Sequence, residues 1–197
     1  MAARFERRGV RTLVAETRRK APDHDELRWL LTEETFVDHE DGAEVHRKIL
    51  RHPGIVVIVP FVADDRIVLL RQFRFPIGHD GLWELPAGTI EATLRGGEMI
   101  VLETALECAS RELPEEAGYR ATTMREAARV HMMPGTGDQL ATVCFATGLE
   151  RVPVDPDDQE DITEIRAFSK TELRAMIAAR EITDAKTLVG LMYALSD

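Results

Sequence analysis

The chain has 197 residues, of which 44% are hydrophobic and 30% charged, a composition typical of one folded domain and not of a disordered chain. Its 35 acidic residues outnumber its 25 basic ones, and the formal net charge of −10 argues against a protein that binds the phosphate backbone of nucleic acids. The longest apolar stretch, residues 54–62, is far too short to span a bilayer, so we expect no membrane insertion.

The cellular compartment is predicted from the N-terminus and the cysteines. The first 20 residues are rich in basic side chains and lack the apolar core of a secretory signal. The two cysteines, Cys108 and Cys144, cannot form a disulfide framework and do not have the paired spacing of a metal site. These features predict a protein of the reducing cytoplasm.

The first 50 residues are predicted to form a layer of antiparallel strands. An Asp41-Gly42 pair marks a hairpin-type turn between the second and third of them. The strand patterns cover residues 11–16, 27–38 and 43–51. We therefore expect an N-terminal strand layer over 1–50 and a second domain over 51–197.

The second domain mixes strands with helices. The β-branched run at 55–61 is typical of a strand that is buried on both faces. Apolar residues at three- and four-residue steps predict a helix over 97–118, which Gly118 would end. Further strands are expected at 67–71, 121–130, 141–148 and 162–168, and helices at 170–180 and 184–195. This order of elements predicts an α/β layered sandwich around a mixed sheet.

Three carboxylates share one face of the long predicted helix. Glu112, Glu115 and Glu116 lie three and four positions apart and are therefore neighbours on the helix surface. Carboxylates this close repel one another unless they are neutralised, and a divalent cation with oxygen ligands, Mg²⁺ or Mn²⁺, would neutralise them. Arg111 is suited to hold one of them in place. The alternative is a solvated helix face that binds no ligand.

The wider pattern around these carboxylates runs from Gly97 through Glu103 to the segment 111–119, which reads RELPEEAGY. This spacing resembles the Nudix box, the signature of hydrolases that act on a nucleoside diphosphate linked to another moiety.

The resemblance implies a role for each acidic residue of the pattern. Glu112 and Glu116 would be the principal metal ligands, and Glu115 a supporting ligand or a carboxylate that orients water. Glu103 and Arg111 would position the cluster.

Other segments extend the resemblance, over roughly residues 45–195, to the branch that contains ADP-ribose and ADP-sugar pyrophosphatases. They are His52-Pro53-Gly54, Gln72-Phe73-Arg74, the segment 83–88 (WELPAG), Pro134 at sixteen positions after Gly118, and the segment 182–187 (ITDAKT). The branch implies that the backbone carbonyl of Ala87 is a metal ligand and that Arg74 and Glu84 bind the substrate. It also uses an aromatic residue of the N-terminal layer to stack the adenine, which here would be Trp29. The alternative for Trp29 is a residue of the strand core.

A second acidic segment, residues 155–164, contains six acidic residues and no basic one. It is either a solvated loop or the source of the general base that deprotonates the attacking water. In the related enzymes this loop supplies both a base and a metal ligand. The match favours Glu160 as the ligand and leaves Asp158 or Glu160 as the base.

The sequence departs from the family pattern at three places. The first glycine of the box is normally that of the Pro-Ala-Gly turn, here Gly88, which lies fifteen positions before Glu103. We therefore expect a nine-residue insertion within 89–102. Pro114 would kink or distort the helix, and Gln139 stands where related enzymes often carry an acid.

The resemblance as a whole implies a Nudix-type α/β/α sandwich around a mixed sheet, preceded by the antiparallel strand layer. It implies an enzyme that uses Mg²⁺, or Mn²⁺, to hydrolyse ADP-ribose or related ADP-sugars to AMP and a sugar phosphate. It also implies a homodimer in which the N-terminal strands pack on or swap with the partner. Two alternatives remain: a pyrophosphatase of GDP-mannose or another nucleotide sugar, and a module that senses ADP-ribose without cleaving it.

Overall fold

The computed structural model describes residues 3–21, 24–153 and 162–196. These residues form two compact units. The N-terminal unit contains the residues up to Gly54 together with Glu91–Leu102 and His131–Leu140, and the remaining residues form the central unit. In the described part of the chain, no helix is long and apolar enough to cross a membrane.

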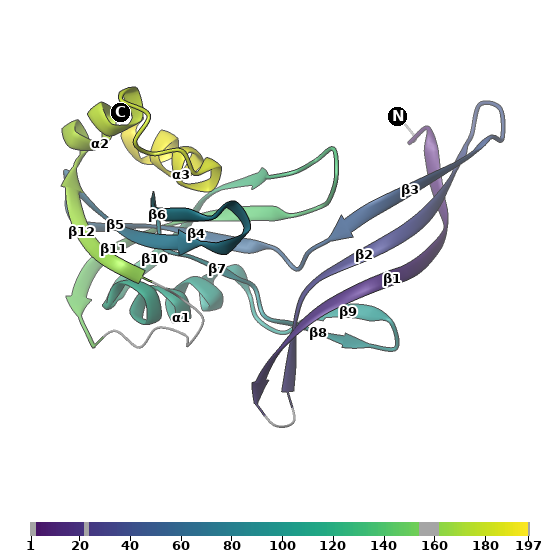
Figure 1. Ribbon diagram of the computed structural model, residues 1–197, viewed down its shortest axis with the longest axis horizontal. Coiled ribbons are helices and arrows are strands. Elements are labelled where there is room, and N and C mark those ends of the chain that lie inside the picture. Colours follow the sequence, from purple (N-terminus) through teal and green to yellow (C-terminus); the bar gives the residue numbers. More distant parts are fainter. Residues whose placement is uncertain (1–2, 22–23, 154–161, 197) are drawn as a thin grey trace. The chain divides into compact units, whose positions relative to one another are not determined.

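Three long antiparallel strands in the order β1-β2-β3 form the main sheet of the N-terminal unit (Figure 1). They are β1 (Phe5–Ala21), β2 (His24–Asp38) and β3 (Glu44–Arg51). The expected strand layer is thus confirmed, although β1 extends well beyond the predicted 11–16. The expected turn is also present, since Gly42 has a positive φ of 75° and its N–H donates to the Asp38 carbonyl at 2.9 Å.

The segment that we interpreted as an insertion forms a separate two-stranded hairpin in the same unit. Its strands are β8 (Ala92–Arg95) and β9 (Glu98–Val101), and Gly96 and Gly97 form the turn with φ values of 59° and 86°. Glycine adopts such positive φ values without the steric cost that a Cβ brings. Ala92 packs with Leu27 and Leu30 of β2 in a small apolar cluster.

The central unit is built on a seven-stranded mixed sheet, with β11 parallel to β4 and the other strand pairs of known register antiparallel. Five strands follow the order β10-β11-β4-β5-β12, while β6 pairs with β5 and β7 with β4. The strands are β4 (Ile55–Ala63), β5 (Arg66–Arg74), β6 (His79–Glu84), β7 (Ala87–Thr89), β10 (Tyr119–His131), β11 (Leu140–Arg151) and β12 (Ile162–Ser169). A short 3₁₀ helix, Phe75–Ile77, separates β5 from β6.

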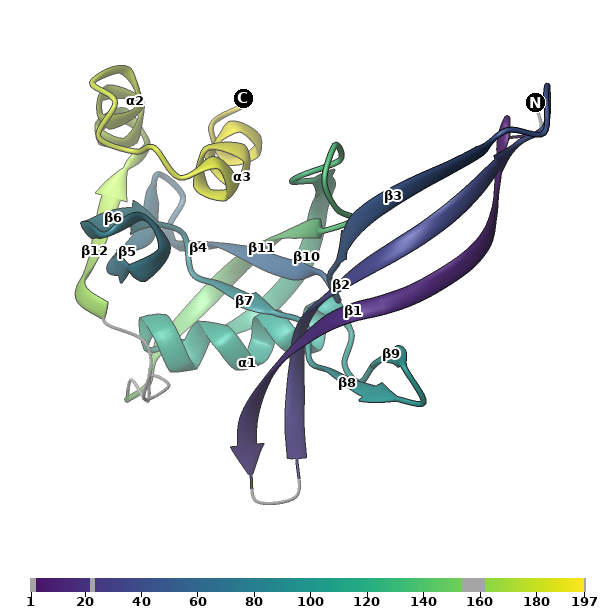
Figure 2. The same cartoon turned by 45° about the vertical axis from the view of Figure 1, so that its right-hand side comes forward.

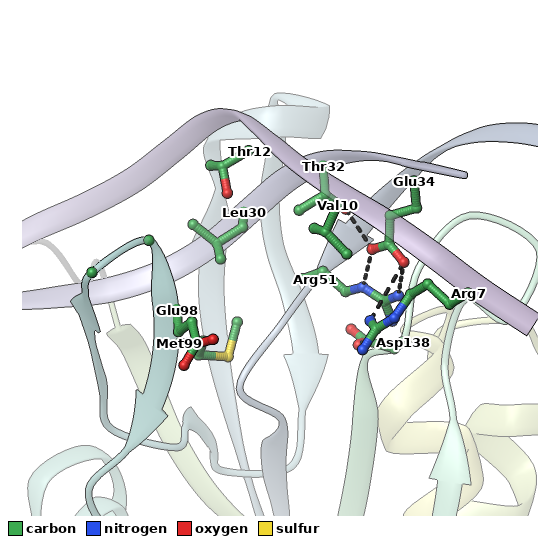
Figure 3. Close-up of a pocket in the computed structure, with 12 residues that line it drawn as sticks. Arg7, Val10, Thr12, Leu30, Thr32, Glu34, Arg51, Glu98, Met99 and Asp138 are labelled. Atoms are coloured by element: carbon green, nitrogen blue, oxygen red, sulfur yellow. Dashed lines mark hydrogen bonds and ion pairs between the residues drawn. The ribbon is translucent and has the colours of Figure 1, made fainter. Parts of the chain in front are cut away.

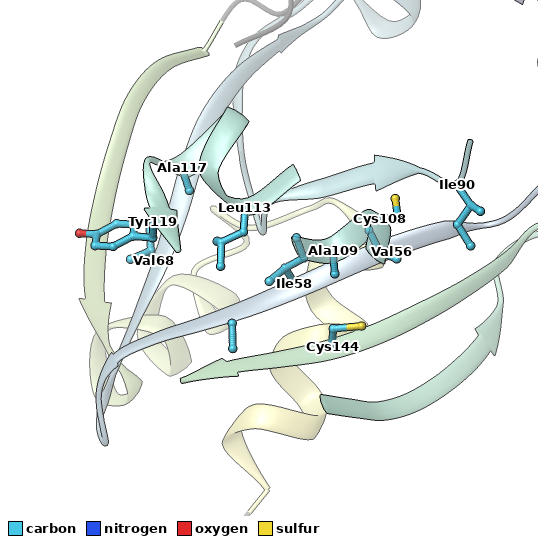
Figure 4. Packing of buried hydrophobic residues seen from close by; sticks show 11 residues of the cluster. Val56, Ile58, Val68, Ile90, Cys108, Ala109, Leu113, Ala117, Tyr119 and Cys144 are labelled. Atoms are coloured by element: carbon cyan, nitrogen blue, oxygen red, sulfur yellow. The ribbon is translucent and has the colours of Figure 1, made fainter. Parts of the chain in front are cut away.

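Helices cover both faces of this sheet, as Figures 1 and 2 show. They are α1 (Ala105–Ala117), α2 (Lys170–Ala178) and α3 (Ala185–Leu195). Side chains alternate between the faces of a strand, so β4 serves both sides. Val56 and Ile58 join the buried cluster under α1 (Figure 4), whereas Val57 and Val59 lie next to Gly190 of α3. This arrangement confirms the expected α/β/α sandwich.

The long helix begins later than the sequence analysis predicted. Helix α1 starts at Ala105, because Thr104 caps it in a capping box with Glu107, so the expected start at residue 97 was wrong. Its end was predicted correctly: Gly118 adopts a left-handed φ of 67° and its N–H donates to the Pro114 carbonyl at 3.1 Å. The helix continues through Pro114 to Ala117.

Candidate active site

Two acidic side chains of α1 point inward onto strand β7. Glu112 and Glu116 lie one helical turn apart and are only 8% and 2% exposed. The backbone N–H of Ala87 donates to the Glu116 carboxylate at 2.9 Å. The structure therefore brings together the Ala87 turn and both predicted principal ligands.

Glycine at position 88 makes room for this arrangement. A Cβ on Gly88 would lie closer than 3.0 Å to three atoms of the Glu112 side chain, whereas one on Gly97 would meet nothing within 4 Å. Gly88, and not Gly97, is therefore the glycine that packs against the helix. The distance in sequence from Gly97 to Glu103 matches the family pattern only because the hairpin β8–β9 is inserted between the Ala87-Gly88 turn and α1.

Arg111 donates to three carboxylates in and just before α1. Its Nη1 donates to Glu112 at 2.7 Å and to Glu115 at 3.2 Å, and its Nη2 donates to Glu103 at 2.7 Å. Burial works against the charged form, but the hydrogen bond to Glu103 and the negative charge of Glu112 raise the pKa of Arg111 above its usual value. Arg111 is thus a permanent cation beside Glu103, Glu112 and Glu115. Glu116, one turn along the helix from Glu112, is the fourth carboxylate of the cluster.

The chemistry of this cluster fits a hard divalent cation. Its donors are oxygens only, and two of its carboxylates are buried, a situation that is costly without a compensating positive charge. Among the described residues, no group of three or more His, Cys, Asp or Glu side chains is placed to hold a metal ion. The predicted ligand Glu160 and the candidate base Asp158 lie outside the described residues.

A second charged cluster surrounds Glu84 at the end of β6. The Glu84 side chain is 1% exposed and accepts from Nε and Nη2 of Arg74 at 2.8 and 2.6 Å. Lys186, in the first turn of α3, also donates to Glu84, and it donates to Asp184 at 2.9 Å. The hydrogen bonds that Arg74 donates to Glu84 are the main cause of a raised Arg74 pKa, to which the charges of Glu84, Glu116 and Asp184 also contribute.

The sequence analysis assigned roles to Arg74 and Glu84 but missed Lys186 and Asp184. Asp184 caps α3 by accepting from the Thr187 N–H at 2.9 Å, and a Thr187 hydroxyl oxygen accepts from Leu85 N–H at 2.9 Å. An acid just before a helical pattern is an N-cap signal, so Asp184 was detectable. The contact between Lys186 and Glu84 spans 102 residues and had no local signal.

The N-terminal unit contains a cavity of about 760 Å³ with polar and apolar side chains in its lining (Figure 3). At its wall the fully buried Glu34 accepts from Arg51 at 2.7 and 2.5 Å, and Arg51 also donates to Asp138 at 2.9 Å. Asp138 directly precedes Gln139, and no role was assigned to it from the sequence. Trp29 lies half-buried on β2 of this unit, and its predicted role stays a prediction.

Comparisons with known proteins agree with this geometry. The family model described as the NUDIX domain matches residues 50–188, more than two thirds of the chain. The chain therefore belongs to the Nudix family of hydrolases, which confirms the resemblance found in the sequence.

Three relatives illustrate this membership, and one solved structure shares the fold. The chain is 29% identical to an ADP-ribose pyrophosphatase of Bacillus subtilis, with 80% of each chain covered. It is 31% identical to one of Mycobacterium tuberculosis, covering 77% of this chain and 69% of the relative. A methanol dehydrogenase activator of Bacillus methanolicus is 30% identical, with 80% of each covered. A solved structure described as an ADP compounds hydrolase superposes with a TM-score of 0.65 at 17% identity. The superposition covers 94% of this chain and 92% of the solved one, and it confirms the fold.

Proposed function

We propose that this protein hydrolyses the pyrophosphate bond of ADP-ribose or a related ADP-sugar with the help of a divalent cation. The observation that carries the proposal is the buried pair Glu112 and Glu116, packed against the Ala87-Gly88 turn within a Nudix domain. Two relatives named ADP-ribose pyrophosphatases support the substrate class.

The reaction adds one water molecule across the diphosphate. The water oxygen forms a bond to one phosphorus, the bridging P–O bond breaks, and the water's protons go to the base and to the bulk solvent. ADP-ribose would give AMP and ribose 5-phosphate.

The proposed roles are those that the resemblance to the Nudix box and to the ADP-ribose pyrophosphatase branch implies. Glu112, Glu116 and the Ala87 carbonyl would hold Mg²⁺, with Mn²⁺ as an alternative, and Glu160 would add a ligand. When bound, the cation would neutralise charge on the diphosphate oxygens. Glu115 would orient the attacking water, and Asp158 or Glu160 would take its proton.

Three residues are proposed to bind the substrate: Arg74, Glu84 and Trp29. Glu84 holds the Arg74 guanidinium, and more than a third of the Arg74 side chain is exposed. An accessible guanidinium is well suited to bind a diphosphate. Trp29 would stack the adenine.

The test is to incubate the purified protein with ADP-ribose and MgCl₂ and to separate the products by ion-exchange chromatography. We expect AMP and ribose 5-phosphate in equal amounts, and no AMP when EDTA replaces MgCl₂. Absence of AMP with both MgCl₂ and MnCl₂ would refute the proposed substrate.

A second candidate substrate is GDP-mannose. The chain is 27% identical to a GDP-mannose pyrophosphatase of Yersinia enterocolitica, covering 73% of this chain and 74% of the relative. A panel of ADP- and GDP-sugars at equal concentration decides between them, because the two hypotheses predict opposite rankings of kcat/KM.

We also propose that the protein is a cytoplasmic homodimer whose copies meet through the N-terminal strand layer, residues 1–50, with 51–197 as the hydrolase domain. The support is strand β1, which stands at the end of its sheet with Phe5, Val10 and Val14 44%, 54% and 46% exposed. A long edge strand with exposed apolar side chains favours pairing with another chain. Light scattering coupled to size exclusion would give twice the chain mass, and a monomeric mass would overturn this proposal.

A further inference from the structure

Two cations share one buried carboxylate in the central unit. Glu84, at 1% exposure, is bound by the Arg74 guanidinium and by the Lys186 ammonium group. The Lys186 side chain is 13% exposed and also contacts Asp184, which is 18% exposed. Arg74, Lys186, Glu84 and Asp184 therefore form a neutral group of two positive and two negative charges.

The position of Lys186 is fixed by the start of α3. Asp184 caps this helix through the Thr187 N–H at 2.9 Å, and the Thr187 hydroxyl accepts from the Leu85 N–H at 2.9 Å. Leu85 directly follows Glu84, so the helix start and the end of β6 are joined by hydrogen bonds. Lys186 therefore meets Glu84 in a defined geometry and not as a flexible surface charge.

The orientation of Arg74 determines what its free edge can bind. Arg74 uses Nε and Nη2 to grip Glu84, so the edge formed by Nη1 and Nη2 points away from that carboxylate. The charge of Glu116, one of the proposed metal ligands, is among the influences on the Arg74 pKa, which places this cation within electrostatic reach of the helix carboxylates.

Removal of the Lys186 charge would change this balance. Glu84 and Asp184 would then have Arg74 as their shared cation within this group, and the group would carry a net charge of −1. The positive field of Arg74 would be cancelled where an anionic substrate must approach, because a buried charge is poorly screened by solvent.

We propose that Lys186 is a positioning residue: it neutralises Glu84 and so leaves the outer edge of Arg74 available to bind the diphosphate of the substrate. This inference rests on the proposed function. Lys186 acts through Glu84 and Arg74, and its own ammonium group stays with the two carboxylates.

The test compares Lys186→Met, Lys186→Arg and the matched control Lys170→Met, which removes a lysine charge from α2. With ADP-ribose and MgCl₂, we expect Lys186→Met to raise KM about tenfold and to change kcat less than about threefold, since ground-state binding of the anion is what weakens. Lys186→Arg restores the charge and should bring KM to within about twofold of the wild type, as should Lys170→Met. An unchanged KM in Lys186→Met, or no rescue by arginine, overturns the proposal.

A binding measurement separates this inference from the proposed function. Inorganic pyrophosphate in MgCl₂, titrated calorimetrically, probes anion binding without turnover, and we expect about tenfold weaker binding by Lys186→Met. If the wild type binds pyrophosphate but does not cleave ADP-ribose, the proposed substrate fails while the weaker binding still supports the role of Lys186. Equal binding by the two proteins, or none by the wild type, refutes that role. Lys186→Gln gives the same comparison if Lys186→Met does not fold.

Discussion

Substitution of Gly88 by alanine should reduce catalysis and leave the fold intact. The new Cβ would lie closer than 3.0 Å to the carboxylate of Glu112, and ordinary contact begins near 3.4 Å. The φ of Gly88 is not in the left-handed region, so alanine suits the backbone, and the Glu112 side chain must give way from its Cγ outward. We estimate that the carboxylate retreats by roughly 1 Å.

A displacement of this size is small for stability and large for catalysis. A misplacement of about 1 Å in a catalytic constellation can cost about 100-fold in rate. The free energy of unfolding should fall by about 1 kcal/mol or less, because the carboxylate can move toward solvent without opening a cavity. We therefore expect Gly88→Ala to fold, to melt within a few degrees of the wild type, and to lose about 100-fold in kcat/KM for ADP-ribose.

The assay measures AMP release at saturating MgCl₂ and unfolding by circular dichroism. Gly9→Ala is the matched control, since a Cβ there would meet only Thr35, at 3.9 Å, and its activity should stay within about twofold of the wild type. If Gly88→Ala keeps activity within about threefold of the wild type, Glu112 does not need its observed position and the reasoning is refuted.

Three further predictions concern charge. Glu116→Gln keeps an oxygen that can accept from the Ala87 N–H but removes the negative charge. The kcat should therefore fall about 100-fold or more, while the melting temperature changes little. Full activity would exclude Glu116 as a ligand. Arg111→Met leaves neighbouring carboxylates without their shared cation. It should lower the free energy of unfolding by about 3 kcal/mol in EDTA and by less in MgCl₂, where the bound cation would replace part of the lost charge. An equal loss in both solutions would argue against cation binding here. Burial, together with the charge of Arg28, lowers the pKa of His52 to about 4. Because the unfolded chain takes up that proton near pH 6.5, His52 should lower the stability by about 1.4 kcal/mol per pH unit as the pH drops from about 6.5 to 4. His52→Asn should make the slope of stability against pH, measured by urea titration, shallower by this amount, and an unchanged slope would contradict the assignment.

Local patterns were enough to predict most of the elements. The β-branched run 55–61 became the buried strand β4, and Gly118 ended α1 as its position indicated. The start of α1 was missed because apolar spacing extended past Thr104, although the capping box formed with Glu107 was present in the sequence.

By itself, the sequence determined the family and the helix that carries the acidic cluster. Residues three and four positions apart on a helix must share a face, so the grouping of Glu112, Glu115 and Glu116 followed from their spacing alone. The RELPEEAGY segment and the Pro-Ala-Gly turn were sufficient for the resemblance that the NUDIX match confirmed.

Only the tertiary structure decided which side chain Gly88 packs against and which cations surround Glu84. The sequence already favoured Gly88 over Gly97 as the box glycine, but only packing showed that Gly88 lies against Glu112 and that Gly97 lies in a hairpin turn. Likewise, Glu84 and Lys186 meet because β6 and the start of α3 are brought side by side by the fold. Contacts between residues this far apart depend on how sheet and helices pack, and no local pattern in the chain encodes them.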